Sequence, residues 1–451
     1  MTKPLLLVLV VLLALGSAAA AGGRVDHPGA ARPAARADSH SATMTLAATL
    51  PKGGTVNSDI AFWGNLAYQG SYDGFRIIDI TKPDAPSLLA DVHCGAGQGD
   101  VTVWKNILVR SVDYPVTQRS CKGQRSDDPT IAGLFEGLQI FDVAKPRRAR
   151  LVKLVDTDCG SHTNTLVPDT AHGRVLIYVL SYALLPGPHC GGQREANPLH
   201  AKISIVSVPL AHPANAAIVG TPAVDAEPFV AGQLGSTIGC HDMGVFMPLH
   251  LAAVACLSEA QLWDISDPLH PRTIVHIQEP VPGFEIWHSA TFTWDGKYIV
   301  FGDESGSGSC HGDQTEPDGR VWFYKVSDLL AGTTTPLSSF LIGRNQHAAY
   351  CSAHMFNVVP VKNRYVLVSS WYTGGVDAIE FTDPAHPREL GWYDLESPRE
   401  GEFWAAYWYN GFVYGSDMPN GFDSFRFKST RVAGAKRLGH LNPQTQEMYV
   451  R

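Results

Sequence analysis

A short segment that recurs along the chain constrains the fold more than any other feature of the sequence. Its clear copies span residues 74–86, 137–146, 261–271 and 376–387, and weaker copies span residues 203–209 and 321–327. Each copy is a short run rich in β-formers, and the clear copies lead into a turn that contains Pro, which cannot continue a β-ladder. Repetition at this spacing predicts an architecture built from similar β-units.

Each repeated strand follows a predicted hairpin, such as residues 60–63 with 66–69, and an apolar strand such as residues 88–92 usually comes after it. The hairpin turns contain residues that tolerate positive φ, among them Gly64-Asn65. Hairpin, repeated strand and closing strand make a four-stranded unit, which is a propeller blade. No stretch sustains the 3.6-residue apolar period of a long helix.

The hairpins begin near seven positions, which are Asp59, Asp100, His162, His241, His288, His354 and Trp404. We therefore expect an all-β fold, a single seven-bladed β-propeller with four antiparallel strands per blade. The seventh unit has no clear closing strand, whereas the strand at residues 44–50 has no unit of its own. An N-terminal strand that completes the last blade would close the ring and remove its exposed edges.

The two ends of the chain differ from this pattern. Lys3, an apolar run from Leu5 to Leu15 that is too short to span a bilayer, and small residues up to Ala21 predict a signal peptide at residues 1–21. Residues 22–42, rich in Ala, Pro, Gly and Arg, predict a flexible leader. The propeller is then expected over residues 43–429, with a C-terminal tail at 430–451, in a secreted protein.

All eight cysteines follow the predicted signal peptide, and an even number in an exported protein predicts disulfides. Several lie in long insertions or just before a histidine. We expect insertions to be tied to the next blade by the pairs Cys121–Cys159, Cys190–Cys240 and Cys310–Cys351. The pair Cys240–Cys256 is a competing alternative.

The charge of the chain limits the partners that it can have. The formal net charge is −8 and no run of Lys and Arg occurs, so nucleic acid is a poor partner. We expect no membrane span and a small-molecule substrate, and leave the oligomeric state open.

The repeated strand and turn resemble the LVIVD repeat, whose name corresponds here to residues 75–79 and their copies. The resemblance covers most of residues 43–427. It implies a propeller and is nearly silent on activity, because a fold does not fix a function.

Four histidines stand at the start of the innermost strand in four consecutive blades, and they are His162, His241, His288 and His354. Innermost strands surround the axis of a propeller, so matching positions on them can converge. Neutral imidazoles suit Cu, Fe, Zn and Ni, which predicts a metal site made of these four residues. The alternative is that histidines near strand ends have structural roles only.

Three carboxylates accompany the histidines in the predicted ring, namely Asp59, Asp100 and Glu402. A carboxylate that accepts a hydrogen bond from a ligating His fixes its tautomer. We expect Asp100 or Glu402 to have this role or to act as a general base. Asp at the start of a strand can also simply cap a turn.

The histidine ring is similar in arrangement to those of carotenoid cleavage oxygenases and of the selenium-binding protein and methanethiol oxidase group, without a shared longer motif. The resemblance implies a metal-dependent oxidase or oxygenase. Because an exported protein meets its metal outside the cell or during export, we expect Cu or Fe, with Zn as a further option. A non-enzymatic extracellular binding propeller, with structural metal or none, is the alternative. A hydrolytic zinc enzyme ranks lower, because four His would fill a zinc tetrahedron.

Overall fold

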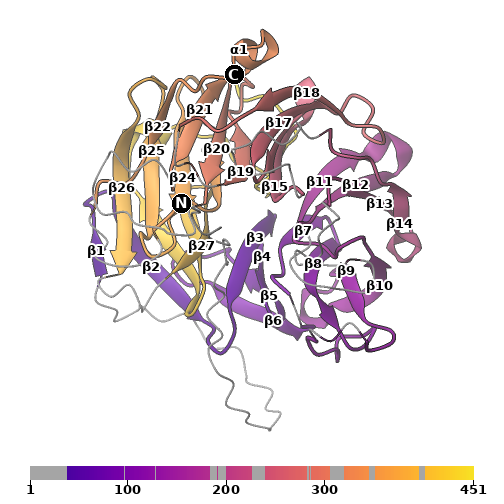
Figure 1. The fold of residues 1–451 in the computed structure, drawn as a ribbon. Helices are drawn as coiled ribbons and strands as arrows, with labels where there is room; N and C mark the ends of the chain where they lie inside the picture. The colour runs from indigo at the N-terminus through magenta and orange to yellow at the C-terminus, as the bar shows by residue number, and fades with distance from the viewer. Residues whose placement is uncertain are drawn as a thin grey trace, which may run out of the picture.

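Seven sheets, each built on four antiparallel strands, are arranged in a ring around a central axis, which confirms the predicted seven-bladed β-propeller (Figure 1). The computed structural model describes residues 38–451 except 96, 127, 129, 183–189, 191–199, 226–238, 282–283, 285, 305–318, 345–350 and 396–401. The predicted signal peptide, residues 1–21, and most of the predicted leader lie outside the described residues. Within the described part, no helix is long and apolar enough to cross a membrane.

Each of the first four blades has its innermost strand first in sequence. Blade 1 comprises β3 (Asn57–Trp63), β4 (Leu66–Ser71), β5 (Gly74–Asp79) and β6 (Ser87–His93). Blade 2 comprises β7 (Val101–Trp104), β8 (Ile107–Val116), β9 (Phe135–Asp142) and β10 (Arg150–Asp156). Blade 3 comprises β11 (Thr163–Asp169), β12 (Arg174–Leu180), β13 (Ser204–Pro209) and β14 (Ala217–Gly220). Blade 4 comprises β15 (Asp242–Phe246), β16 (Leu251–Cys256), β17 (Glu259–Asp264) and β18 (Arg272–Ile277).

The last three blades complete the ring. Blade 5 comprises β19 (Trp287–Phe292), β20 (Tyr298–Asp303), β21 (Val321–Lys325) and β22 (Ser338–Phe340), with the short helix α1 (Val326–Leu330) between its last two strands. Blade 6 comprises β23 (Phe356–Val358), β24 (Val366–Ser370), β25 (Val376–Glu380) and β26 (Arg388–Leu395). Blade 7 comprises β27 (Phe403–Tyr409), β28 (Phe412–Asp417) and β29 (Gly421–Phe427), and β2 (Met44–Pro51) closes it as predicted by pairing with β29.

Both terminal segments add strands to blades that were already complete. Residues 38–40, at the end of the predicted leader, form β1 (Asp38–His40) on the outer edge of blade 6. In the predicted tail, β30 (His440–Leu441) pairs with β3, and β31 (Thr445–Gln446) pairs with β15. Both partners are innermost strands, so the C-terminal segment lies against the axis. The short 3-10 turns are η1 (Pro146–Arg148), η2 (Thr170–His172), η3 (Pro213–Asn215), η4 (Met247–Leu249) and η5 (Thr430–Val432).

Apolar side chains from facing sheets fill the space between neighbouring blades. Between blades 6 and 7, for example, Val366 and Val376 share a buried cluster with Phe403 and Phe425. The alternation of side chains along each strand buries one set against the preceding blade and the other against the next. This packing fixes the innermost strands, which carry the candidate site.

Three disulfides follow a pattern different from the predicted one. They join Cys94 to Cys121, Cys159 to Cys190, and Cys240 to Cys256. The predicted pairs Cys121–Cys159 and Cys190–Cys240 are therefore wrong, and the competing pair Cys240–Cys256 is confirmed.

The reason for the difference lies in the direction of the insertions. The first cysteine of each pair lies in the segment that enters a blade, and its partner follows or ends the second strand of that same blade. An insertion thus folds back onto the entry of its own blade. Cys351 is also disulfide-bonded, whereas its predicted partner Cys310 lies outside the described residues.

Candidate metal centre

The strand register confirms that the four histidines occupy one position but moves Asp59 and Asp100 away from it. In each blade the repeated third strand pairs with the second strand, which pairs in turn with the innermost strand. Through these pairs, the same position of the repeat is in register with Ile60 in blade 1, Val101 in blade 2 and Met243 in blade 4. The residues just before these three are Asp59, Asp100 and Asp242. The histidine of blade 4, His241, stands one residue earlier.

The same counting gives the histidine position in blades 3, 5 and 6, as His162, His288 and His354. Asp59 and Asp100 therefore belong to a second layer of axial residues, one step further along the strands. A one-residue displacement moves a side chain about 3.3 Å along the strand and turns it toward the other face of the blade.

The four imidazoles lie against one another in an unbroken series. Ring centroids are 4.3 Å apart for His162 and His241, 3.9 Å for His241 and His288, and 4.4 Å for His288 and His354. The Nε2 atoms of His162 and His241 are 2.8 Å apart. Two nitrogens bound to one metal at about 2.0–2.1 Å and at right angles would be roughly 2.9 Å apart, so this spacing suits shared coordination.

Hydrogen bonds anchor the outer nitrogen of two of the rings. His162 Nδ1 lies 3.0 Å from Asp113 Oδ2, and both side chains are buried. His354 Nδ1 lies within hydrogen-bond distance of the main-chain carbonyl of Trp404. Both acceptors require a proton on Nδ1, so the lone pair on each Nε2 can accept a hydrogen bond or bind a metal, and that of His162 faces His241 Nε2.

The loop before blade 2 holds Asp113 in place. The Gln98 main-chain N–H donates to Asp113 Oδ1 at 2.8 Å. Gly97, with φ of +99°, lies so close that an added Cβ would be 2.8 Å from the same oxygen. Glycine is needed here both for its backbone angle and for the space that Asp113 occupies.

The other two imidazoles have nitrogens without hydrogen-bond partners. His288 is fully buried, and neither Nδ1 nor Nε2 has a partner among the described residues. Its Nε2 lies 3.5 Å from Glu304 Oε2. The nitrogens of His241 and His288 and a carboxylate oxygen of Glu304 lie within 4.8 Å of one another. Unpartnered buried imidazoles are costly unless something binds them.

Burial also sets the protonation state of three of the rings. It holds the pKa of His241 and His288 well below the usual range for histidine, and neighbouring imidazoles lower both pKa values further. The pKa of His354 falls to about 3, mainly because of burial. These residues are therefore neutral at physiological pH, which is the form that binds metals.

Hydroxyl groups on the innermost strands fix the backbone of two of the histidines. Thr163, which follows His162, donates to the main-chain carbonyl of His241. Ser289, which follows His288, donates to the carbonyl of His354 at 2.8 Å. The residue after one histidine thus binds the backbone of the next, so adjacent blades hold the ring rigidly.

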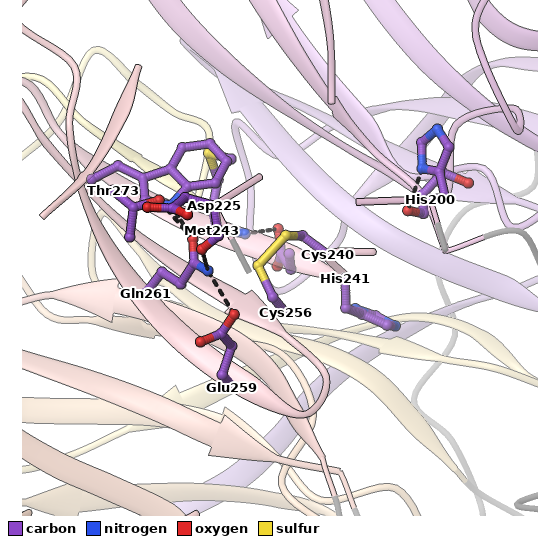
Figure 2. The surroundings of a disulfide bond; sticks show 12 residues. His200, Asp225, Cys240, His241, Met243, Cys256, Glu259, Gln261 and Thr273 are labelled. Atoms are coloured by element: carbon purple, nitrogen blue, oxygen red, sulfur yellow. Dashed lines mark hydrogen bonds between the residues drawn. A yellow bond between two sulfur atoms is a disulfide. The ribbon is translucent and has the colours of Figure 1, made fainter. Parts of the chain in front are cut away.

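The disulfide of blade 4 lies directly behind the ring. Figure 2 shows Cys240 bonded to Cys256 between His241 and the hydrogen-bonded pair Glu259–Gln261. The bridge joins the start of the innermost strand to the end of the second strand. It thereby fixes the backbone from which His241 extends.

Tyrosines at the ends of second strands surround the histidines, and sequence reasoning missed them. Tyr182 stacks on His241 at 5.4 Å between ring centroids, and Tyr372 lies 4.5 Å from His354. The Tyr372 hydroxyl donates to Glu304. Burial raises the pKa of both tyrosines, so they stay protonated and can donate hydrogen bonds. Tyr72 is half-buried, and desolvation, followed by the charges of neighbours that include Asp113, raises its pKa.

Asp100 and Glu402, the predicted catalytic carboxylates, have no hydrogen bond to any of the four histidines among the described residues. Asp100 accepts hydrogen bonds from Asn164, at 2.6 Å from the main-chain N–H and 2.9 Å from Nδ2. Glu402 precedes β27, and burial raises its pKa. The carboxylates beside the imidazoles are Asp113 and Glu304. Asp113 lies within β8, directly after the continuous pairing of β8 with β9 ends at Val112, and Glu304 lies just past the end of β20.

A second cluster of potential ligands is inert. Asp158, Cys159 and His200 lie within coordination distance of one another. Cys159 is bonded to Cys190, so its sulfur is no thiolate and cannot serve as a metal ligand.

Comparison with known proteins gives information about the fold and none about the site. No family model matches the chain, and no curated protein sequence matches it. Among solved structures, a candidate 6-phosphogluconolactonase from Bacteroides uniformis aligns with a TM-score of 0.50 and 10% identity, over 80% of this chain and 89% of the other. One from Bacteroides fragilis aligns with a TM-score of 0.48 and 10% identity, over 81% and 93%. At this identity, the alignment with the Bacteroides uniformis protein shows a similar fold and nothing more.

Proposed function

We propose that the protein is a secreted, metal-dependent oxidoreductase whose axial centre holds Cu or Fe on His162, His241, His288 and His354. The observation that carries the proposal is the contact between His162 and His241, whose Nε2 atoms lie 2.8 Å apart inside a series of four touching imidazoles. The ring resembles those of the carotenoid oxygenase and methanethiol oxidase groups in arrangement. The disulfides agree with an oxidising compartment.

The residues fit such a metal in chemical terms. Imidazole suits Cu and Fe, and His241 and His288 retain buried nitrogens without hydrogen-bond partners. When bound, a redox metal with positions beyond its four His ligands would supply activation of O₂ or substrate and electron transfer. Zinc fits less well, because four His would complete its usual tetrahedron.

The side chains around the ring have separate tasks in this proposal. Asp113 and the Trp404 carbonyl keep His162 and His354 in the tautomer that binds metal. Tyr182 and Tyr372 cover the imidazoles, and the protonated hydroxyl of Tyr182 can orient a polar group of the substrate. Glu304 accepts the Tyr372 hydrogen bond beside His288, so it is positioned to receive a proton through that hydroxyl. Asp100 and Glu402 remain candidates for a general base further from the ring.

Elemental analysis of the secreted protein tests the metal centre. We expect close to one Cu or Fe per chain in the parent protein and its loss in the His241→Ala/His288→Ala double variant. The matched control is His270→Ala/His386→Ala, which removes two exposed turn histidines that bind Asp267 and Asp383. Absence of metal from parent and double variant alike, with both folded, would reject the centre.

Oxygen consumption tests the reaction class separately. The metal-loaded protein should consume O₂ with thiols, apocarotenoids or phenols, and the double variant should not. Stoichiometric metal without O₂ consumption on any of these classes would favour the binding propeller with a structural metal.

A further inference from the structure

Arg110 is a buried cation that no carboxylate contacts directly. It belongs to β8, the second strand of blade 2, and it is fully buried. Within the described residues it forms no ion pair, and its hydrogen-bond acceptors are all neutral. They are the main-chain carbonyls of Ser71, Gly74, Cys94 and Gly97 and the Oε1 atom of Gln139. Because a buried charge is costly, a negative group is expected close by.

One of these acceptors connects Arg110 to the histidines. Arg110 Nη2 donates to the Gly97 carbonyl at 3.3 Å, and the Gln98 N–H donates to Asp113 Oδ1 at 2.8 Å. This carbonyl and this N–H belong to the same peptide group, and a trans peptide points them in opposite directions. Asp113 Oδ2 in turn lies 3.0 Å from His162 Nδ1. A continuous path of hydrogen bonds therefore runs from the guanidinium through one peptide and one carboxylate to the imidazole.

The charges at the two sides of the peptide reinforce this path. A cation that binds a peptide carbonyl polarises the group and makes its N–H a stronger donor to a carboxylate. Burial lowers the pKa of Arg110 to about 10, and the negative charges of Asp73 and Asp113 counteract this effect, so the guanidinium stays cationic at neutral pH. Arg110 and Asp113 thus compensate each other across the peptide.

The peptide is also held sterically between its two partners. A Cβ at Gly97 would lie 2.8 Å from Asp113 Oδ1, and a Cβ at Gly99 would lie 3.0 Å from Arg110 Nη2. Both glycines have positive φ, of +99° and +78°. At the start of the same loop, Cys94 is disulfide-bonded, and its carbonyl accepts from Arg110 Nη1 at 3.1 Å. The loop therefore fits closely between the guanidinium and the carboxylate.

We propose that Arg110 is a positioning residue of the histidine centre and acts on His162 through the Gly97–Gln98 peptide and Asp113. It orients the carboxylate that keeps the His162 proton on Nδ1, which leaves the Nε2 lone pair to bind metal. This inference rests on the proposed function, since it assigns to that centre a residue that has no hydrogen bond to any of the four histidines among the described residues.

The NMR resonance of the His162 Nδ1 proton tests the path in the metal-free protein. An imidazole N–H that donates to a carboxylate resonates at low field, and its loss in His162→Gln identifies the signal. In Arg110→Gln we expect the signal to shift upfield or to disappear, because the cation that polarises the peptide and orients Asp113 is gone. Loss of buried hydrogen bonds alone would lower stability without this change in the spectrum.

Arg76→Gln is the matched control. Arg76 is a similarly buried arginine of blade 1, and burial likewise lowers its pKa to about 10. Its side chain binds Gln69 and the carbonyls of Leu50 and Pro51, none of which contacts a histidine of the ring. This variant should lose stability in urea as Arg110→Gln does, and it should keep the His162 signal.

Metal affinity gives a second readout. Arg110→Gln should bind Zn(II) and Cu(I) about tenfold more weakly, at the lower end of the range for a group that supports a ligating His. Arg76→Gln should bind both metals as the parent does. Because the proton signal is recorded without metal, a parent that binds no metal would reject the proposed function and leave the test of Arg110 on His162 valid.

Three results would overturn the proposal. The first is a folded Arg110→Gln variant whose His162 proton signal matches that of the parent. The second is an equal change of that signal in both arginine variants. If Arg110→Gln does not fold, hydrogen exchange of the parent decides, because the Gln98 N–H should exchange slowly when its peptide is hydrogen-bonded on both sides. Rapid exchange of that amide would be the third.

Discussion

The hydrogen bond between Asp113 and His162 gives the sharpest test of how the chain prepares its histidines. In Asp113→Asn, two donors compete for the single amide oxygen. They are the Gln98 main-chain N–H and His162 Nδ1, which lie 2.8 Å and 3.0 Å from the two carboxylate oxygens of Asp113. If the oxygen accepts from Gln98, the amide NH₂ faces His162 Nδ1, and the proton of the imidazole must move to Nε2. If the amide turns around, two donors face each other at Gln98.

Either arrangement weakens metal binding or the fold. Loss of a carboxylate partner of a ligating His typically lowers metal affinity about 10–100-fold, or roughly 1.4–2.7 kcal/mol. Placing two buried donors against each other costs about 1–3 kcal/mol of stability. We therefore expect affinity for Cu(I) and Zn(II) to fall at least about tenfold, with any unsatisfied donor appearing as a lower urea midpoint.

The assay is a competition titration against a chromophoric chelator, with urea unfolding of the metal-free protein alongside. Asp156→Asn is the control, because Asp156 is a blade 2 carboxylate that pairs with Arg119 at the surface. Parent-like affinity and stability in Asp113→Asn would refute the assigned tautomer. Tenfold weaker binding in the control would show that the effect is not specific to His162.

Three further predictions concern stability. First, unfolded imidazoles take up protons below about pH 6.5, whereas burial lowers the pKa of His288 in the folded state. The metal-free parent should therefore lose stability relative to His288→Gln as the pH falls toward 5, by up to about 1.4 kcal/mol per pH unit. The comparison with the variant is needed because the raised pKa of Asp100 changes stability with pH in the opposite direction. A parent that became more stable relative to the variant as the pH fell would contradict the prediction. Second, Asn442→Ala should lower the free energy of unfolding by about 1–3 kcal/mol, because it removes the hydrogen-bond partner of both main-chain groups of Val103. An unchanged urea midpoint would show that water replaces the amide. Third, Cys240→Ala/Cys256→Ala opens a bridge with a sequence separation of 16 and should cost about 3 kcal/mol, with weaker metal binding through His241; equal melting of parent and variant would exclude this role.

The architecture could be predicted because the repeat and its register are local properties of the sequence. Strand, Pro turn and hairpin recur at a similar spacing, and the unmatched strand at residues 44–50 led to the correct closure of blade 7. The disulfides were harder, because pairing depends on where an insertion returns in space. Cys94 follows β6 and bonds to Cys121 in the insertion of the next blade, a connection that spacing alone does not favour over its alternatives.

The four histidines could be identified because they share a register, but their supporting residues could not. Asp113 lies at a register shift inside β8 and Glu304 lies just past the end of β20, and nothing in the sequence shows that either carboxylate reaches a histidine. Asp59 and Asp100 seemed to align with the histidines because strand starts cannot be located to within one residue without the cross-strand pairs. That displacement of one residue moves both carboxylates to the register position that Asp242 occupies in blade 4.

The C-terminal segment explains why the two ends of the axis differ. An innermost strand has one edge without a neighbouring strand, and its N–H and C=O groups need partners when water is excluded. A carboxamide offers one donor and one acceptor side by side, as a peptide group does. Asn442 accordingly binds both main-chain groups of Val103, and Gln446 binds both of Phe292. These contacts lie toward the ends of the innermost strands, whereas the histidines stand at the beginning of such strands, beside Tyr182 and Tyr372. The C-terminal segment and the histidines therefore belong to opposite ends of the axis.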